Sequence, residues 1–575
     1  MVSISFQDLK KNLKKDFSGL LPVKLAVLGD SATQMYVQAI KGFGYETGIK
    51  FEVFEADYDQ VERQIYDTSS ELFKFKPEFV VIFFCSNKLM QKFGNLDLNE
   101  KPDFGNSIIR EIKSLYRSLQ SELKCKLIFA NFPAINESVF GNYANKTNFS
   151  FTYQLRKINF ELMNFAQLQA NFYILDINTL QAQYGQFFIT TQKIYINTDL
   201  FPSIDFLPIL AKNTIDIVQS IKGNFKKCLI LDLDNTLWGG IIGDDGMENI
   251  QIGDLGIGKA FSEIQLWVKQ LKERGIIIAV CSKNDEQVAK EPFEKHSDML
   301  LRLDDIAVFL ANWENKADNI KKIQSILNIG FDSMVFLDDN PFERNMVRTH
   351  INDITVPELP EDPADYLDYL RTLNLFETSS FTGEDSHRTK QYQEEAKRST
   401  FQQQFTNETE FLTSLKMVSK VEAFNSFNIP RVAQLTQRSN QFNLRTIRYS
   451  EEDIKRIAND SKYLDITFTL QDKFGDNGLI SIVILQKKTD KSLFIDTWIM
   501  SCRVLKRNME NFVLNTIVAK AVEQGFLTIT GEYIPTSKNN MVKDHYKNLG
   551  FIDEGGYWNL NVNNYIPKEC QIEIE

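Results

Sequence analysis

The chain has 575 residues, enough for three or four domains of about 150 residues, each able to bury its own core. Apolar residues make up 43% of it and charged residues 25%, which is a globular composition and excludes a largely disordered chain. The net charge of −11 argues against a nucleic-acid-binding protein, and no run of eighteen apolar residues predicts a membrane-spanning helix.

The cysteines and the N-terminal segment indicate the compartment. The six cysteines are widely spaced and form no CxxC pair, so the sequence predicts neither a zinc ribbon nor a disulfide framework. The first 17 residues alternate charged and apolar residues, as an amphipathic helix does, and hold no apolar core of signal-peptide length. We therefore expect a cytoplasmic protein with reduced thiols.

Residues 1–222 alternate strand-like and helix-like segments, which is typical of a parallel α/β sheet. The first expected strand, VKLAVLGDS, contains Asp30 and Ser31 at its end and resembles the opening motif of SGNH hydrolases. The serine of that family needs a histidine base, and no histidine precedes His296. We expect an SGNH-like domain without hydrolase activity that binds a partner or covers the reactive crevice of the next domain.

Residues 223–360 form a second expected α/β domain, with strands CLILDL, GIIIAV, SMVFL and DITVP. CLILDL predicts a buried strand that leads into Asp232 and Asp234. Side chains two positions apart share one face of a strand, so the two carboxylates leave the sheet close together. Their repulsion requires a shared proton or a bound cation, unless they are only a turn aspartate and a helix-capping aspartate.

The other expected strands bring further polar residues to the same edge. GIIIAV runs toward Ser282, MVFL ends at Asp338 and Asp339, and Lys316 stands near a helix start. The carboxyl ends of parallel strands meet at one edge, so these groups are expected to share a crevice. Carboxylates in that number favour a hard divalent cation such as Mg²⁺. An aspartate there can attack phosphorus while Mg²⁺ and lysine offset the phosphoryl charge.

Four segments of this domain, DLDNT, CSKN, NKADN and LDDNP, resemble the motifs of the haloacid dehalogenase (HAD) superfamily of phosphatases in order and spacing. By that resemblance Asp232 is the nucleophile and Asp234 the general acid/base. The resemblance also implies phosphate binding by Ser282, Lys316 and Thr236, and a Mg²⁺ site made by Asp232, the Asp234 carbonyl, Asp338 and Asp339. The open alternative is a degenerate, non-catalytic copy of the fold.

The spacing of the motifs leaves no room for a cap domain. The segments between Asp234 and Ser282, and between Lys316 and Asp338, are too short to hold one. Phosphoryl transfer benefits from the exclusion of water. Closure of the crevice is therefore expected to come from a neighbouring domain or from a macromolecular substrate.

Residues 361–410 are charged and predict a helical connector to a third domain, residues 411–575. This last domain shows three strands of antiparallel character, a long helix, a further strand and a helix over NNMVKDHYKNLG, which together predict a mixed sheet. The start of the long helix, SCRVLKRNMENF, resembles the acyl-CoA N-acyltransferase (GNAT) fold, where R-x-x-G-x-G/A opens a helix that binds a pantetheine pyrophosphate.

Two residues depart from the GNAT pattern. Lys506 and Asn508 replace its small residues, which argues against CoA. A single pantetheine phosphate on a carrier protein, met by Arg503, Lys506 or Arg507, fits the local basic cluster, because carrier proteins are usually acidic. The alternative is a solvated charged turn.

Several stretches resemble the FkbH-like family of glyceryl transferase/phosphatases: LDLDNTLWGGIIGDDG, RVAQLTQRSNQFNL, DKFGDNGLI, SCRV and GEYIPTSKNNMVKDHYKNLGF. The resemblance covers most of residues 223–560. It implies an α/β protein with SGNH-like, HAD-like and GNAT-like domains that takes a three-carbon unit from 1,3-bisphosphoglycerate. That unit is placed on an acyl carrier protein as a thioester on the phosphopantetheine arm, with Mg²⁺-dependent loss of phosphate.

Two cysteines are candidates for a covalent acyl intermediate. Cys502 lies at a strand end beside the expected pantetheine groove, and its basic neighbours Arg503 and Arg507 favour the thiolate. Cys281 adjoins Ser282, but strand alternation points it away from that serine. His545 is either a base or a residue on the surface of a helix.

Two other functions stay open from the sequence. One is a HAD phosphatase that acts on another phosphorylated small molecule or sugar, and the other is a scaffold that binds a carrier protein without catalysis. The intact four-motif set favours an enzyme. The missing cap and the GNAT-like domain favour a carrier-bound substrate over a free metabolite.

Overall fold

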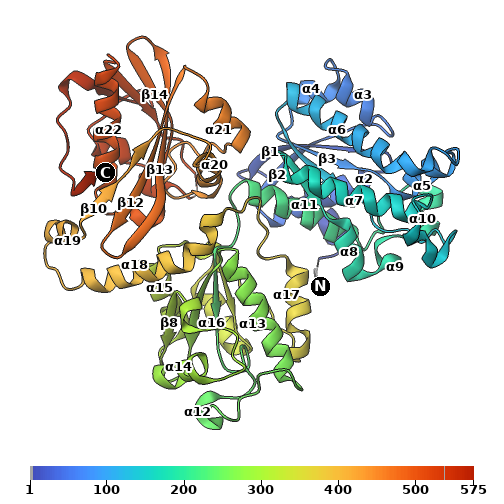
Figure 1. Ribbon diagram of the computed structural model, residues 1–575, viewed down its shortest axis with the longest axis horizontal. Helices are drawn as coiled ribbons and strands as arrows, with labels where there is room; N and C mark the ends of the chain where they lie inside the picture. The colour runs from blue at the N-terminus through green and yellow to red at the C-terminus, as the bar shows by residue number, and fades with distance from the viewer. Residues whose placement is uncertain (1–3, 537) are drawn as a thin grey trace. The chain divides into compact units, whose positions relative to one another are not determined.

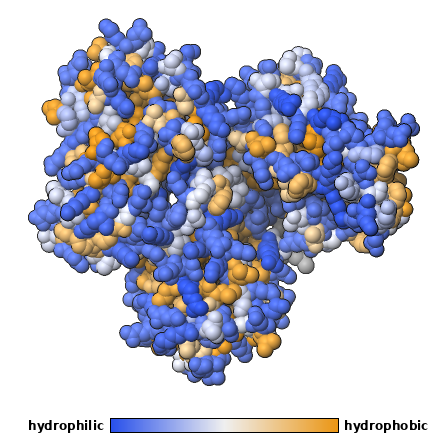
Figure 2. All heavy atoms as spheres, viewed as in Figure 1, coloured by the Kyte–Doolittle hydropathy of each residue, from blue (hydrophilic) through white to orange (hydrophobic). Residues whose placement is uncertain are grey.

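The computed structural model describes residues 4–536 and 538–575. The chain separates into two compact units, Met1–Ser220 and Ile221–Glu575. Hydrophilic residues cover most of the face seen in Figure 2, and hydrophobic residues occur there in small, separate patches. Among the described residues, no helix combines the length and the apolar character that crossing a membrane requires.

The first unit is built on a parallel sheet with strand order β2-β1-β3-β4-β5 (Figure 1). Its strands are β1 (Leu21–Gly29), β2 (Ile49–Glu55), β3 (Phe79–Phe83), β4 (Lys126–Ala130) and β5 (Phe172–Leu175), and β1 begins two residues before the expected strand VKLAVLGDS. Its main helices are α1 (Phe6–Asn12), α2 (Gln34–Glu46), α5 (Ser86–Gly94), α6 (Phe104–Glu122), α7 (Phe151–Gln167), α8 (Ile177–Tyr184), α10 (Gln192–Thr198) and α11 (Leu207–Ile221). Buried aromatic and aliphatic side chains from β3, β4, α6 and α7 form one core of this unit. Residues 1–3 of the expected N-terminal helix lie outside the described residues.

The second unit begins with a parallel sheet of strand order β8-β7-β6-β9. Its strands are β6 (Cys228–Leu231), β7 (Ile277–Ser282), β8 (Val308–Ala311) and β9 (Met334–Leu337), and its main helices are α12 (Ile242–Asp245), α13 (Gly258–Glu273), α14 (Glu286–Lys295), α15 (Lys316–Leu327) and α16 (Pro341–His350). Leu229 and Leu231 face one core of this region, and Cys228 and Ile230 face the other. Burial on both faces explains why the strand is apolar throughout.

Two strand predictions in this region need correction. DITVP forms no strand, because only one isolated bridge joins Thr355 to Val335. The strand β8 was not predicted from the sequence, although its segment VFLA is apolar. A short apolar run carries no periodicity that separates a strand from a loop or a helix.

The absence of a cap domain is confirmed over residues 234–338, all of which are described. Between Asp234 and Ser282 the chain holds only a glycine-rich loop, α12 and α13. Between Lys316 and Asp338 it holds α15 and a short turn before β9. The carboxyl ends of β6, β7 and β9 are therefore not covered by an inserted domain.

The C-terminal region folds as a mixed sheet with strand order β16-β17-β15-β14-β13-β12-β10-β18. Its strands are β10 (Met417–Ser419), β11 (Val421–Glu422), β12 (Tyr463–Asp472), β13 (Gly475–Thr489), β14 (Ser492–Met500), β15 (Thr528–Glu532), β16 (Ile552–Glu554), β17 (Tyr557–Asn561) and β18 (Ile572–Ile574). Antiparallel β12, β13 and β14 are followed by α22 (Met509–Glu523) and then by β15, which is parallel to β14. This is the GNAT-like order that the sequence predicted.

β14 and β15 separate soon after they pair. The two strands pair only along Ser492 to Phe494 of β14. Farther along β14, a different segment of the chain pairs with it in place of β15. Asn443 bridges Ile499, and Met500 N donates to the carbonyl of Phe442 at 3.2 Å. A segment of this same chain therefore fills the space between the two diverging strands.

The expected connector is helical and belongs to the second unit. It contains α17 (Tyr366–Leu373), α18 (Arg388–Gln402) and α19 (Glu408–Ser414). From α18, the Gln393 side chain donates to the carbonyl of Ile306 at 2.9 Å, and the Arg398 guanidinium pairs with Asp472 at 2.8 Å. One helix thus contacts both the β6–β9 region and the C-terminal sheet.

The remaining helices of the C-terminal region are α20 (Ile429–Arg438), α21 (Glu451–Ala458) and α23 (His545–Asn548). The continuous helix expected over NNMVKDHYKNLG is wrong. The segment forms a short 3₁₀ turn, Asn540–Val542, and then the single turn of α23.

Candidate functional site

The carboxyl end of β6 gathers the aspartates that the motifs singled out. Asp232 N donates to the Leu337 carbonyl at 2.9 Å, so the chain stays in register with β9 for one residue beyond the strand. Asn235 then takes a left-handed backbone conformation with φ 51°, which begins the turn. Carboxylate oxygens of Asp232, Asp338 and Asp339 all lie within 4.8 Å of one another. The sheet thus brings together three of the predicted metal ligands.

Lys316 lies between two of these carboxylates. Its Nζ is 2.8 Å from Asp232 Oδ2 and 2.6 Å from Asp338 Oδ2, and the residue is only 3% exposed. It is the first residue of α15, which Asn315 caps through a 2.7 Å bond from Ala317 N. Burial opposes the lysine charge, but the two carboxylates raise its pKa. The lysine is therefore a charged, fixed group.

One lysine does not balance the charge of the cluster. Burial and the charge of Asp232 raise the pKa of Asp338 to about 7, and the same two causes raise the pKa of Asp339 to about 6. Within the described residues, the buried Asp232 Oδ1 has no hydrogen-bond partner. An unsatisfied carboxylate oxygen among three acidic groups fits a divalent cation with oxygen ligands.

Asp234 is held apart from this cluster. Its Oδ1 accepts from Trp238 Nε1 at 2.9 Å and from Ile242 N at 3.0 Å, and its Oδ2 accepts from Asn284 Nδ2 at 2.8 Å. The carboxylate is only partly buried and has a defined orientation. Two neighbouring aspartates thus have different surroundings, as a nucleophile and a proton-transfer group require.

The predicted phosphate-binding residues Ser282 and Thr236 lie at the carboxyl ends of the neighbouring strands β7 and β6. Ser282 ends β7, is buried, and accepts from Asn284 Nδ2 at 3.2 Å. Thr236 is also buried, and its hydroxyl accepts from Asp339 N at 3.1 Å. Its hydroxyl therefore joins the β6 loop to the β9 loop.

Three positioning residues were not identified from the sequence. Asn284 orients Asp234 and Ser282, and Trp238 donates to Asp234. Arg344 donates to the carbonyls of Asp338 and Asp339 at 2.8 and 2.7 Å and so fixes the loop after β9. Trp238 and Asn284 lie inside or next to motifs quoted above. The hydrogen bonds of Arg344 run from α16 to the loop before it, and no rule of residue spacing predicts them.

Comparison with known proteins shows the family to which the chain belongs. Residues 24–219 match the family model described as FkbH, N-terminal domain. The N-terminal part of the protein BF1531 from Bacteroides fragilis is 54% identical, and its structure is described as containing a phosphatase domain complexed with Mg. The similarity covers 66% of this chain and 100% of that chain, with a TM-score of 0.64. The chain belongs to the FkbH-like family. It carries a HAD-type phosphatase domain.

The C-terminal region of this FkbH-like chain gives weaker matches. The ribosomal-protein-S18-alanine N-acetyltransferase from Escherichia coli is 15% identical, over 26% of this chain and 100% of that chain, with a TM-score of 0.21. Among curated proteins, no sequence matches the chain.

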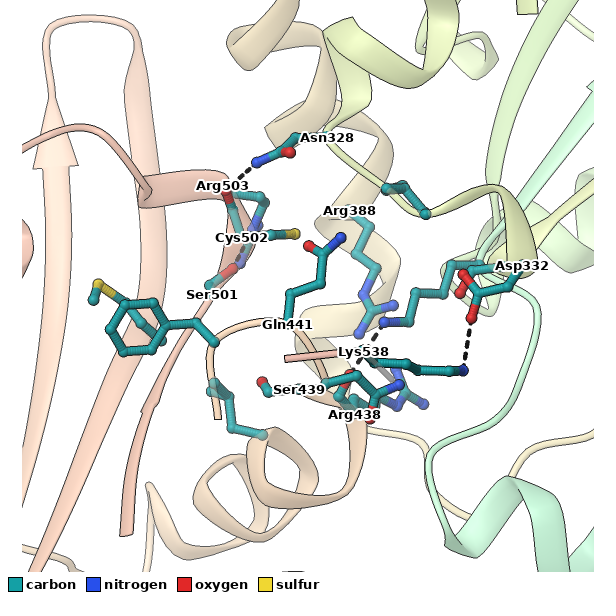
Figure 3. A pocket seen from close by; sticks show the side chains of 18 of the residues that line it. Asn328, Asp332, Arg388, Arg438, Ser439, Gln441, Ser501, Cys502, Arg503 and Lys538 are labelled. Atoms are coloured by element: carbon teal, nitrogen blue, oxygen red, sulfur yellow. Dashed lines mark hydrogen bonds and ion pairs between the residues drawn. The ribbon is translucent and has the colours of Figure 1, made fainter. Parts of the chain in front are cut away.

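Cys502 lies far from the aspartate cluster of this FkbH-like chain. It begins a 3₁₀ turn, Cys502–Val504, is half-buried and lines a cavity of about 530 Å³ (Figure 3). Its carbonyl accepts from Asn328 Nδ2 at 3.0 Å. Lys227, which precedes β6, lines the same cavity, whereas Asp232 follows β6. The extended chain from Lys227 to Asp232 spans roughly 16 Å at about 3.3 Å per residue. The cavity and the aspartate cluster therefore lie at opposite ends of β6.

The other predicted carrier-binding residues have different surroundings. Arg503 is buried and lines the cavity beside Cys502. Lys506 is exposed, and both Lys506 and Asn508 have left-handed backbone angles, φ 64° and 57°. Arg507 does not line the cavity: it is buried and pairs with Asp472 at 3.3 Å and with Glu395.

Arg507 is expected to stabilise the C-terminal region rather than to bind a ligand. The Arg507→Met change leaves Asp472 with Arg398 alone and should lower the free energy of unfolding by about 3 kcal/mol. Urea titration followed by tryptophan fluorescence measures this, because all five tryptophans lie in the second unit. A variant of unchanged stability that loses only ligand affinity would contradict this role.

The other candidate thiol, Cys281, and the candidate base, His545, are both buried. Cys281 is fully buried, its Sγ donates to the Lys316 carbonyl at 3.7 Å, and burial raises the pKa of its thiol. His545 is not on the surface as one expectation had it: it packs against Phe442 and Trp498, and burial lowers its pKa to about 3. Of the two cysteines, Cys502 is the one beside a cavity.

In the first unit, Ser31 is 2% exposed, and within the described residues its hydroxyl has no hydrogen-bond partner. Burial raises the pKa of the neighbouring Asp30 to about 7. This unit has no histidine, so Ser31 lacks the histidine base that an SGNH hydrolase uses. The absence of SGNH hydrolase activity stays a prediction.

Proposed function

We propose that the protein is a Mg²⁺-dependent HAD-type phosphatase that also loads a three-carbon acyl unit from 1,3-bisphosphoglycerate onto an acyl carrier protein. The observation that carries the phosphatase is the cluster of the buried Asp232, Lys316 and Asp338 with the half-buried Asp339, in which Asp232 Oδ1 lacks a partner among the described residues. The FkbH-like membership of the chain and the Mg complex of the Bacteroides fragilis relative support this reading.

Asp232 and Asp234 divide the phosphoryl chemistry. A carboxylate oxygen of Asp232 attacks phosphorus, the ester P–O bond breaks, and Asp234 gives a proton to the leaving oxygen. Asp234 then takes a proton from the water that hydrolyses the aspartyl phosphate. Lys316 and Ser282 hold the phosphoryl oxygens. Mg²⁺ held by Asp232, Asp338 and Asp339 would supply charge neutralisation for the phosphoryl group.

Cys502 takes the acyl part of the reaction. Its thiolate attacks the carbonyl carbon of the acyl phosphate, a thioester forms, and the C–O bond to phosphate breaks with release of inorganic phosphate. The pantetheine thiol of the carrier then attacks this thioester and frees Cys502. The cavity beside Cys502 and the cluster around Asp232 lie at opposite ends of β6. The remaining phosphate ester must therefore be hydrolysed at the second of these sites. A mobile carrier arm is a means of moving the unit between them.

The pKa values of the aspartates predict how Mg²⁺ binding depends on pH. Metal ligands must be deprotonated, and the pKa values of Asp338 and Asp339 are raised to about 7 and 6. The apparent Mg²⁺ affinity should therefore fall as pH drops from 8 through 7 to 6, by about tenfold per unit for each proton displaced. Isothermal titration with Mg²⁺ at several pH values measures this. An affinity that does not change over that range would contradict the proposed ligand set.

Intact mass spectrometry tests the complete reaction. The protein, Mg²⁺, 1,3-bisphosphoglycerate generated in place and a pantetheinylated carrier protein are incubated together. The proposal expects the carrier to gain a glyceryl group without phosphate. A carrier that stays unmodified while phosphate is released from small phosphoesters would overturn acyl transfer and leave a phosphatase of another phosphorylated small molecule or sugar.

A further inference from the structure

The cavity beside Cys502 is rich in cationic side chains. It lies between the β6–β9 region and the C-terminal sheet, within the second unit, and has a volume of about 530 Å³, in the range of small-ligand pockets. Figure 3 shows Arg388, Arg438 and Lys538 on one side of the cavity, and Arg503 together with Cys502 on the other. The basic residues that line it are Lys227, Arg388, Arg431, Arg438, Arg503 and Lys538.

The cavity has fewer carboxylates than cations: Asp332 and Asp353 line it, Asp332 pairs with Lys538 at 2.6 Å, and Glu384 pairs with Arg431 at 2.8 Å. Asp385 alone serves both Arg388 and Arg438, at 2.8 and 2.6 Å. Arg503 donates to neutral groups, the Gln391 side chain and the Asn477 carbonyl. The result is a local excess of positive charge on a protein whose net charge is −11.

Lys227 shows the same shortage of negative charge. Its Nζ donates to the carbonyl of Arg438 at 3.1 Å, which is a neutral acceptor. Burial lowers the pKa of Lys227 to about 8, and burial together with the charge of Arg388 lowers the pKa of Arg438 to about 9. A bound anion would relieve both effects.

The cavity also has apolar side chains and a thiol in its lining. Phe442, Met500 and Cys502 line the cavity, as does the buried Tyr392. A ligand suited to the cavity therefore has an anionic group at one end and a less polar chain that reaches a sulfur atom at the other.

We propose that this cavity is a second ligand site that binds a phosphate-bearing group against Arg388, Arg438 and Lys227, with the rest of the ligand directed to Cys502. The proposal deepens the proposed function and rests on it for the chemistry at the thiol. The shared chemistry is a phosphoryl group on a short chain, which a phosphorylated small acid and a phosphopantetheine arm both provide. The site is separate from the aspartate cluster, because the two lie at opposite ends of β6.

Protection of Cys502 from alkylation tests the proposal. The full chain is treated with iodoacetamide in EDTA, which silences Mg²⁺-dependent turnover, and labelling is followed by peptide mass spectrometry. Cys570 is also half-buried and does not line the cavity, so it is an internal control. The probes are 3-phosphoglycerate and phosphopantetheine, each compared with its dephosphorylated counterpart.

We expect at least one phosphorylated probe to slow labelling of Cys502 by fivefold or more, while its dephosphorylated counterpart and the Cys570 rate show no such change. Protection by 3-phosphoglycerate identifies a small acid as the ligand, and protection by phosphopantetheine identifies the carrier arm. Arg388→Gln should raise the half-protecting concentration about tenfold, the usual effect of losing a charged hydrogen bond. Lys227→Gln is a second variant in case Arg388→Gln fails to fold.

Arg371→Gln is the matched control, because Arg371 pairs with Asp368 three residues away, as Arg388 does with Asp385, but does not line the cavity. The proposal is overturned if neither phosphorylated probe protects Cys502, if the dephosphorylated forms protect equally, or if the folded cavity variants keep full protection. Mg²⁺-dependent phosphate release is measured separately, so a failure here with intact release overturns the cavity site and not the phosphatase.

Discussion

Asp232→Asn is expected to lower Mg²⁺-dependent phosphate release by about 10⁴-fold, the scale seen when an enzyme loses its nucleophile. An asparagine amide cannot form the aspartyl phosphate. The change also removes one ligand of the proposed metal site and one of the two carboxylates that contact Lys316. Phosphate release from a small phosphoester, measured at saturating Mg²⁺, gives the result.

Asp318→Asn is the control for this change. Asp318 lies two residues after Lys316, is exposed and pairs with Lys321 at 3.1 Å. Its substitution should leave phosphate release within twofold, since exposed ion pairs contribute little. Residual turnover above a few per cent in Asp232→Asn would show that another group attacks phosphorus.

Lys316→Met is expected to destabilise the second unit as well as to slow the reaction. The buried lysine sits within 2.8 Å of Asp232 and 2.6 Å of Asp338, and its removal leaves two carboxylates without their shared cation. Loss of one member of a buried ion pair costs about 3–5 kcal/mol, and loss of one phosphoryl-binding donor costs about 10²–10³-fold in rate. Urea titration by tryptophan fluorescence measures the first effect in EDTA.

Mg²⁺ should restore part of the lost stability, because a divalent cation neutralises the same carboxylates. Lys321→Met, which removes an exposed lysine from the same helix, should change the free energy of unfolding by less than about 0.5 kcal/mol. If Lys316→Met were as stable as Lys321→Met in EDTA, the lysine would not be holding the carboxylates together.

Periodicity and strand ends predicted much of the fold. The expected strand VKLAVLGDS formed as β1, and β6, β7 and β9 formed with polar residues at their carboxyl ends, as their apolar runs indicated. β8 was missed and DITVP wrongly assigned, since short apolar runs do not distinguish a strand from a loop. NNMVKDHYKNLG forms two short turns instead of one helix, and Tyr546 in the second turn is buried.

The candidate phosphatase site was predictable for a simple reason. Its groups follow strand ends of a parallel sheet, and sheet topology alone brings Asp232 and Asp338 together. The basic cavity was not predictable, because Lys227, Arg388 and Cys502 belong to three distant segments. Arg503 and Arg507 look equivalent in sequence, yet one lines the cavity and the other lies in buried ion pairs with Glu395 and Asp472.

The central claim is that hydrolysis of the phosphate ester and formation of the thioester take place at two separate sites of the second unit. The most direct test is the intact mass of Asp232→Asn after incubation with 1,3-bisphosphoglycerate, followed by mapping of the modified peptide. We predict a phosphoglyceryl adduct on Cys502, because its cavity does not include Asp232. Absence of any adduct, or an adduct on another residue while wild-type protein forms one on Cys502, would contradict the claim.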